Sequence, residues 1–125
     1  MMLKLAYLTI GGITGTFARY FLSGFIYRFT GTDFPYGTLV INLMGFFLIG
    51  IFATLSDEKL VLGPDMRVML MAGFCGAFTT FSTFMLETGN LVKDGEWIRA
   101  LGNVLLSVII GFILFRLGVW LGKLV

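Results

Sequence analysis

The stretch "GAFTTFSTFM", residues 76 to 85, places several hydroxyl side chains inside an otherwise apolar run. The hydroxyls belong to Thr79, Thr80, Ser82 and Thr83. Paired β-branched threonines lower helix propensity, and hydroxyls can satisfy backbone groups where a helix unwinds away from water. The stretch therefore predicts a broken helix, and carbonyls freed at such a break can coordinate a cation.

Three phenylalanines accompany these hydroxyls at a spacing of three, at positions 78, 81 and 84. A step of three residues turns an α-helix by about 300°, so the rings cover a broad arc beside the predicted break. Aromatic edges carry partial positive charge. A row of such edges could line a path for an anion, and ordinary helix packing is the alternative.

Three other polar residues lie in apolar surroundings: Arg19, Asn42 and Glu87. A charge inside a bilayer costs at least about 2.5 kcal/mol on insertion scales, although Arg19 is close enough to a span end to reach the interface. Asn42 lies nearer the middle of its span, where an interhelical hydrogen bond is the alternative to an ion site. Glu87 is either a functional carboxylate or a solvated one at the interface.

The composition identifies an integral membrane protein and argues against an enzyme. Of 125 residues, 58% are hydrophobic and 13% are charged, and the mean hydropathy is +0.96. The chain has no histidine, and its one cysteine, Cys75, is expected to be a buried packing residue. The net charge of +2 is spread along the chain, so no nucleic-acid surface is indicated.

The apolar pattern predicts one transmembrane domain, residues 1–125, of four helices. A span needs about 20 apolar residues, and the predicted spans are 5–27, 36–55, 66–92 and 97–121. Because the first apolar pattern continues past Arg19, it is too long for a cleaved signal peptide. An even number of spans places both termini on one side.

Lysines and arginines are almost evenly divided between the two predicted sides. Five belong to the side of the termini and four to the other: Lys4, Lys59, Arg67, Arg116 and Lys123, against Arg19, Arg28, Lys93 and Arg99. Orientation follows a bias in these residues. The small bias is compatible with a single orientation and equally with insertion both ways.

Three stretches resemble motifs of one known family, the Fluc (CrcB) fluoride channels. They are "GGITGTFARY" (11–20), "GTLVINLMGFFLIG" (37–50) and "GFCGAFTTFSTFMLE" (73–87). The third is the most specific, and the fourth predicted span has no sharp motif. Length, number of spans and order of motifs also agree, so the resemblance covers nearly the whole chain.

The resemblance implies a fold and a function. Members of this family are all-α, dual-topology antiparallel homodimers in the cytoplasmic membrane, with four helices per subunit and a broken third helix. Two narrow pores run through the dimer, each lined by both subunits. The channels passively export fluoride across the lipid bilayer and so lower its cytoplasmic concentration.

The resemblance also implies roles for particular residues. The backbone carbonyls of Gly76 and Thr79 would hold a structural Na⁺ at the dimer axis. Arg19 and Glu87 would set the electrostatics of the vestibules, and Asn103 stands where some members carry a tyrosine. The fluoride pore would be lined by Asn42, Phe81, Phe84, Ser107, Thr38 and Thr80.

Two other classes of membrane protein fit part of the pattern. A small dual-topology, proton-coupled exporter of the multidrug type needs a carboxylate within the membrane. The first two spans hold none, and Glu87 lies near a span end. A non-transporting subunit of a membrane assembly would explain the small residues on the helix faces, but not the paired threonines.

Overall fold

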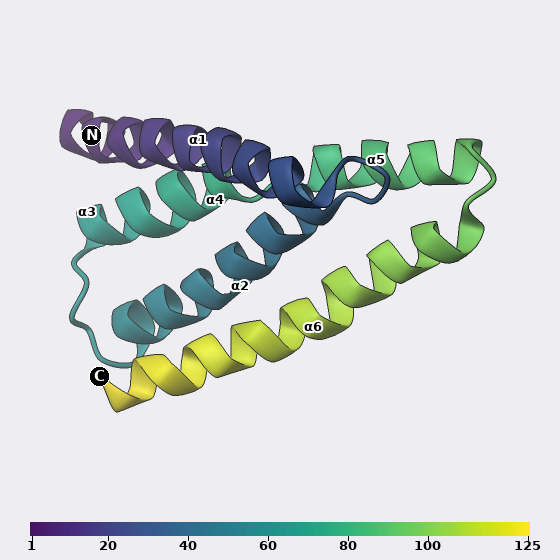
Figure 1. Ribbon diagram of the computed structural model, residues 1–125. Coiled ribbons are helices and arrows are strands. Elements are labelled where there is room, and N and C mark those ends of the chain that lie inside the picture. Colours follow the sequence, from purple (N-terminus) through teal and green to yellow (C-terminus); the bar gives the residue numbers. More distant parts are fainter.

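The protein is all-α, and the computed structural model describes every residue from 1 to 125. The chain has three long helices. Between the second and the last of them lies a helical region that is divided into shorter helices (Figure 1). The elements are α1 (Met2–Thr30), α2 (Tyr36–Asp57), α3 (Pro64–Arg67), the π-helix η1 (Val68–Cys75), α4 (Gly76–Phe78), α5 (Phe81–Lys93) and α6 (Trp97–Leu124).

Each of the four predicted spans lies within a helical region. Three regions are long and apolar enough to cross a membrane: Tyr36–Asp57, Pro64–Lys93 and Trp97–Leu124. Helix α1 has 29 residues but is not among them, because its glycines, its threonines and Arg19 lower its hydropathy. The membrane crossing of α1 therefore stays a prediction.

The helices pack in two pairs. Helix α1 runs beside the region from α3 to α4, and α2 runs beside α6 (Figure 1). The two chain termini lie at the same end of the bundle, and the α5–α6 turn lies at the opposite end. The predicted placement of both termini on one side is therefore confirmed for the folded chain.

Glycines bring these helix pairs into backbone contact. A Cβ on Gly11 would overlap the carbonyl oxygen of Met69 in η1, and one on Gly118 would overlap the carbonyl oxygen of Phe47 in α2. Lipid gives little hydrophobic drive for helix association, so close van der Waals packing through small residues replaces it. The glycine faces thus set the helix spacing.

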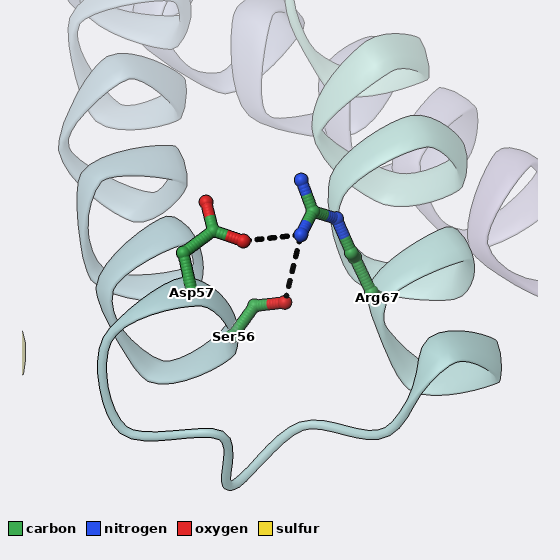
Figure 2. Close-up of polar contacts among 3 residues, drawn as sticks. All are labelled: Ser56, Asp57 and Arg67. Carbon is green, nitrogen blue, oxygen red and sulfur yellow. Dashed lines mark hydrogen bonds and ion pairs between the residues drawn. The ribbon is translucent and has the colours of Figure 1, made fainter.

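Polar contacts secure the end of the bundle that carries the termini. Figure 2 shows Arg67 bonded to Ser56 (Nη1 to Oγ, 3.3 Å) and paired with Asp57. At the same end, Lys123 lies 3.5 Å from a carboxylate oxygen of Glu58. These side chains are about half exposed, so each pair contributes at most about 1 kcal/mol.

The predicted helix break is confirmed at the paired threonines. Helix α4 ends at Phe78, and α5 begins at Phe81. Between them, Thr79 (φ −85°, ψ 157°) and Thr80 (φ −149°, ψ 118°) are extended. The π-helical geometry of η1, just before the break, was not predicted, and such segments often accompany functional sites.

Candidate functional site

The hydroxyls at the break satisfy neighbouring backbone groups. Thr79 Oγ1 donates to the carbonyl of Cys75 at 2.9 Å. Thr80 Oγ1 accepts from the backbone N–H of Thr83 at 3.3 Å and so caps the N-terminus of α5. Thr80 therefore provides an acceptor for an N–H at the helix end that the break creates, whereas the Cys75 carbonyl also keeps the backbone N–H of Thr79 as a donor at 3.0 Å.

Asn42, on α2, binds the broken backbone with both ends of its amide. Its Oδ1 accepts from the N–H of Thr80 at 2.8 Å, and its Nδ2 donates to the carbonyl of Thr80 at 3.1 Å. Only 5% of Asn42 is exposed. A buried extended segment needs such partners, and Asn42 thus joins α2 to the break.

These contacts redirect two N–H groups away from their usual acceptors. In an uninterrupted helix, the N–H of Thr80 would bind the Gly76 carbonyl, and that of Thr83 would bind the Thr79 carbonyl. Here the two N–H groups bind Asn42 Oδ1 and Thr80 Oγ1 instead. The carbonyls of Gly76 and Thr79 thereby lose their helical donors, and a hard cation prefers such oxygen ligands.

One cavity beside the break, of about 350 Å³, brings together four of the predicted pore residues: Asn42, Phe81, Phe84 and Ser107. The ring centroids of Phe81 and Phe84 are 5.6 Å apart. Ser107 Oγ is buried and has no hydrogen-bond partner. Apart from these polar groups the lining is mostly apolar, so the cavity offers ring edges, an amide and a free hydroxyl to a small anion.

A second, polar pocket of about 260 Å³ holds the other two predicted pore residues, Thr38 and Thr80, together with Arg19. Hydroxyls of Thr16, Ser23 and Thr83 line it as well. Arg19 is half-buried and forms no ion pair. Its positive charge is therefore left to attract an anion, beside several hydroxyl donors.

Glu87 is held by two hydroxyls. Tyr27 donates to its Oε2 at 3.1 Å, and Thr38 donates to its Oε1 at 2.6 Å. The side chain is half-buried and faces a third pocket, which also contains Asp33 and Asp94. Thr38 thus links the pocket of Arg19 to Glu87, and the carboxylate is not simply solvated.

Comparison with known proteins identifies the family. Residues 6–119 match the family described as CrcB-like protein, Camphor Resistance (CrcB). The chain belongs to the CrcB family. It is 42% identical over 125 residues to the fluoride-specific ion channel FluC of Solidesulfovibrio magneticus, with both chains covered completely.

Two further relatives in the CrcB family carry the same name. The FluC protein of Desulforapulum autotrophicum is 43% identical over 122 residues, which are 98% of each chain. That of Methylocella silvestris is 47% identical over 121 residues, which cover 95% of this chain and 89% of the relative. The similarity to these fluoride-specific ion channels therefore extends over nearly the full length.

In this CrcB protein, two contacts of the site were missed from the sequence. Tyr27 was not singled out, although it continues the stripe of Arg19 and Ser23 at a spacing of four. The pairing of Asn42 with the Thr80 backbone joins residues 38 positions apart. No local sequence pattern predicts that pairing, because it depends on how α2 lies against the break.

Proposed function

We propose that this CrcB protein is a fluoride-specific ion channel that lets fluoride leave the cytoplasm passively. Its full-length similarity to proteins named fluoride-specific ion channel FluC supports this function. The observation that carries the proposal is the cavity in which Asn42, Phe81, Phe84 and Ser107 meet beside the helix break. A channel moves its ion without changing it chemically, so the protein is not an enzyme.

The site offers fluoride substitutes for its water. An anion entering the bilayer needs hydrogen-bond donors or positive partial charges in place of its hydration shell. Arg19 and the hydroxyls around it attract the ion, and the Ser107 hydroxyl, the remaining N–H of Asn42 and the ring edges receive it. Several weak sites in sequence allow conduction, because no one of them holds the ion too tightly.

The working unit in this proposal is an antiparallel homodimer with four spans per subunit. Phe81 belongs to the cavity but leaves 72% of its surface exposed, which a second copy would cover. The five-to-four division of lysines and arginines supports insertion in both orientations. Each pore would then be completed by residues of both subunits.

The proposal includes a structural Na⁺ held at the dimer axis by the carbonyls of Gly76 and Thr79. Both carbonyls have lost their helical donors, and the space beside Gly76 is open, with Met71 O at 3.8 Å from a Cβ built there. When bound, the ion supplies a fixed positive charge, which favours anions nearby.

Removing Na⁺ tests this site. Protein reconstituted and dialysed in a bulky organic cation should lose fluoride conduction and recover it when Na⁺ is returned, because four carbonyls suit a small hard cation. Thr79→Val keeps the backbone carbonyl and should respond to Na⁺ as the native protein does. Undiminished conduction after prolonged dialysis without Na⁺ would rule the site out.

The function itself is tested in liposomes loaded with fluoride or with chloride. We expect fluoride to leave rapidly down its gradient while chloride stays, and protein-free liposomes to retain both ions. Equal release of both anions would contradict a fluoride-specific channel, and so would the absence of fluoride release from a correctly folded preparation.

A further inference from the structure

A chain of two hydrogen bonds connects α6 to the backbone of Phe84. Asn103 Nδ2 donates to Thr88 Oγ1 at 2.9 Å, and Thr88 Oγ1 donates to the Phe84 carbonyl at 2.7 Å. All three residues are at most 9% exposed. Phe84 forms part of the wall of the cavity that also contains Ser107, one helical turn beyond Asn103.

The direction of these bonds determines what Asn103 can do. A threonine hydroxyl has one hydrogen, and that of Thr88 points to the Phe84 carbonyl. Thr88 Oγ1 must therefore accept from Asn103, which fixes the amide with its nitrogen toward α5. The remaining atom, Asn103 Oδ1, is buried without a partner. A carbonyl oxygen repels anions, so this end of the amide is no ligand for fluoride.

The position of α5 depends on such contacts because the break separates it from α4. Two sets of side-chain hydrogen bonds hold α5 to the other helices. One joins Glu87 to Tyr27 and Thr38, and the other joins Thr88 to Asn103. Between α5 and α6, the bond of Thr88 to Asn103 is the one side-chain hydrogen bond present.

We propose that Asn103 is a positioning residue for the ion path: through Thr88 it holds the first turns of α5, and with them the Phe84 ring, against the cavity. This inference rests on the proposed fluoride channel. Asn103 is not among the residues that line the cavity. If the side chain at position 103 only filled space, leucine would serve equally well, because it has a similar volume and buries no unpaired oxygen.

The test removes the bond from each side. Asn103→Leu and Thr88→Val each delete this hydrogen bond while keeping a side chain of similar volume. The double variant loses the same single bond. We expect each single variant to lower the fluoride efflux rate from liposomes roughly five- to tenfold, as the loss of one buried hydrogen bond would. The double variant should be no slower than either single one, because coupled residues give non-additive effects.

Two further threonine variants separate positioning from general damage. Thr88→Ser keeps the hydroxyl and should restore efflux to near the native rate. Thr9→Val removes an exposed hydroxyl that also donates to the carbonyl four residues before it, and it should conduct normally. All variants are compared as folded dimers in detergent before reconstitution.

Selectivity gives the second readout. A displaced Phe84 ring changes the path itself, so the ratio of fluoride to chloride release should fall in Asn103→Leu and Thr88→Val. A smaller folded fraction would lower the rate of release without changing this ratio. If Asn103→Leu fails to fold, Thr88→Val decides the question. Native rate and ratio in Thr88→Val, or additive losses in the double variant, would overturn the inference. Failure of the native protein to conduct fluoride would instead reject the proposed function.

Discussion

Phe81 and Phe84 belong to one cavity but differ in their surroundings. Phe84 is 8% exposed, whereas Phe81 is 72% exposed, and their ring planes are tilted by 36°. The third member of the stripe, Phe78, is buried and stacks on Phe74 instead. The three regularly spaced rings therefore have two roles. Phe81 and Phe84 line the cavity, whereas Phe78, on the other side of the break, packs within the bundle.

Replacing Phe81 or Phe84 by isoleucine separates ring electrostatics from apolar bulk. Isoleucine keeps most of the volume but lacks the electropositive edge. Edge contacts are worth about 0.5–1.5 kcal/mol, so fluoride efflux from liposomes should fall roughly two- to tenfold in each variant.

The matched control is Phe29→Ile, on the exposed face of α1, where the ring contacts Phe25 away from the cavity. It should conduct normally. The detergent-solubilised dimer should survive in all three variants. Normal efflux in both cavity variants would show that the rings serve packing only.

At the scale of the elements, the sequence predicted the helix and its break but not the π-helical geometry of η1. Paired threonines disfavour a helix locally, so "TTFST" reports the break directly. The π-helix η1 lies directly against Gly11 and Gly15 of α1, where an added Cβ would meet the backbone of Met69 and Phe74. Such a contact between distant segments leaves no local pattern.

The limits of the four predicted spans also show which features the local sequence marks and which it does not. Helices α2 and α6 begin at Tyr36 and Trp97, close to where the predicted spans begin, because loop residues precede them. Helix α1 extends beyond its predicted span at both ends, since a helix continues into water where hydropathy no longer marks it. Hydropathy therefore reports membrane-spanning length better than helix length.

The glycine contact between α2 and α6 can be tested with one methyl group. A Cβ on Gly118 would overlap the carbonyl oxygen of Phe47, whereas nothing lies within 4 Å of a Cβ on Gly102, on the same helix. Overpacking typically costs about 1–3 kcal/mol, so Gly118→Ala should lower the thermal midpoint in detergent and the yield of dimer. Gly102→Ala should leave both unchanged, and equal behaviour of the two variants would contradict the packing described.

For the whole molecule, the antiparallel dimer requires that single chains insert both ways. A cysteine at Asp94, in the turn between α5 and α6, is placed in a variant that lacks the buried Cys75. An impermeant thiol reagent outside intact cells should label about half of the molecules, because the lysine and arginine bias is nearly absent. Labelling of all molecules, or of none, would exclude the antiparallel arrangement.

The most direct test of a passive fluoride-specific channel is the reversal potential in a planar bilayer. With unequal fluoride on the two sides, equal chloride and a separate pH gradient, we predict a current whose reversal potential follows the fluoride gradient. It should not move when the chloride or proton gradient is changed. A reversal potential set by chloride would contradict selectivity for fluoride, and one that shifts with pH would indicate a proton-coupled transporter in place of a channel.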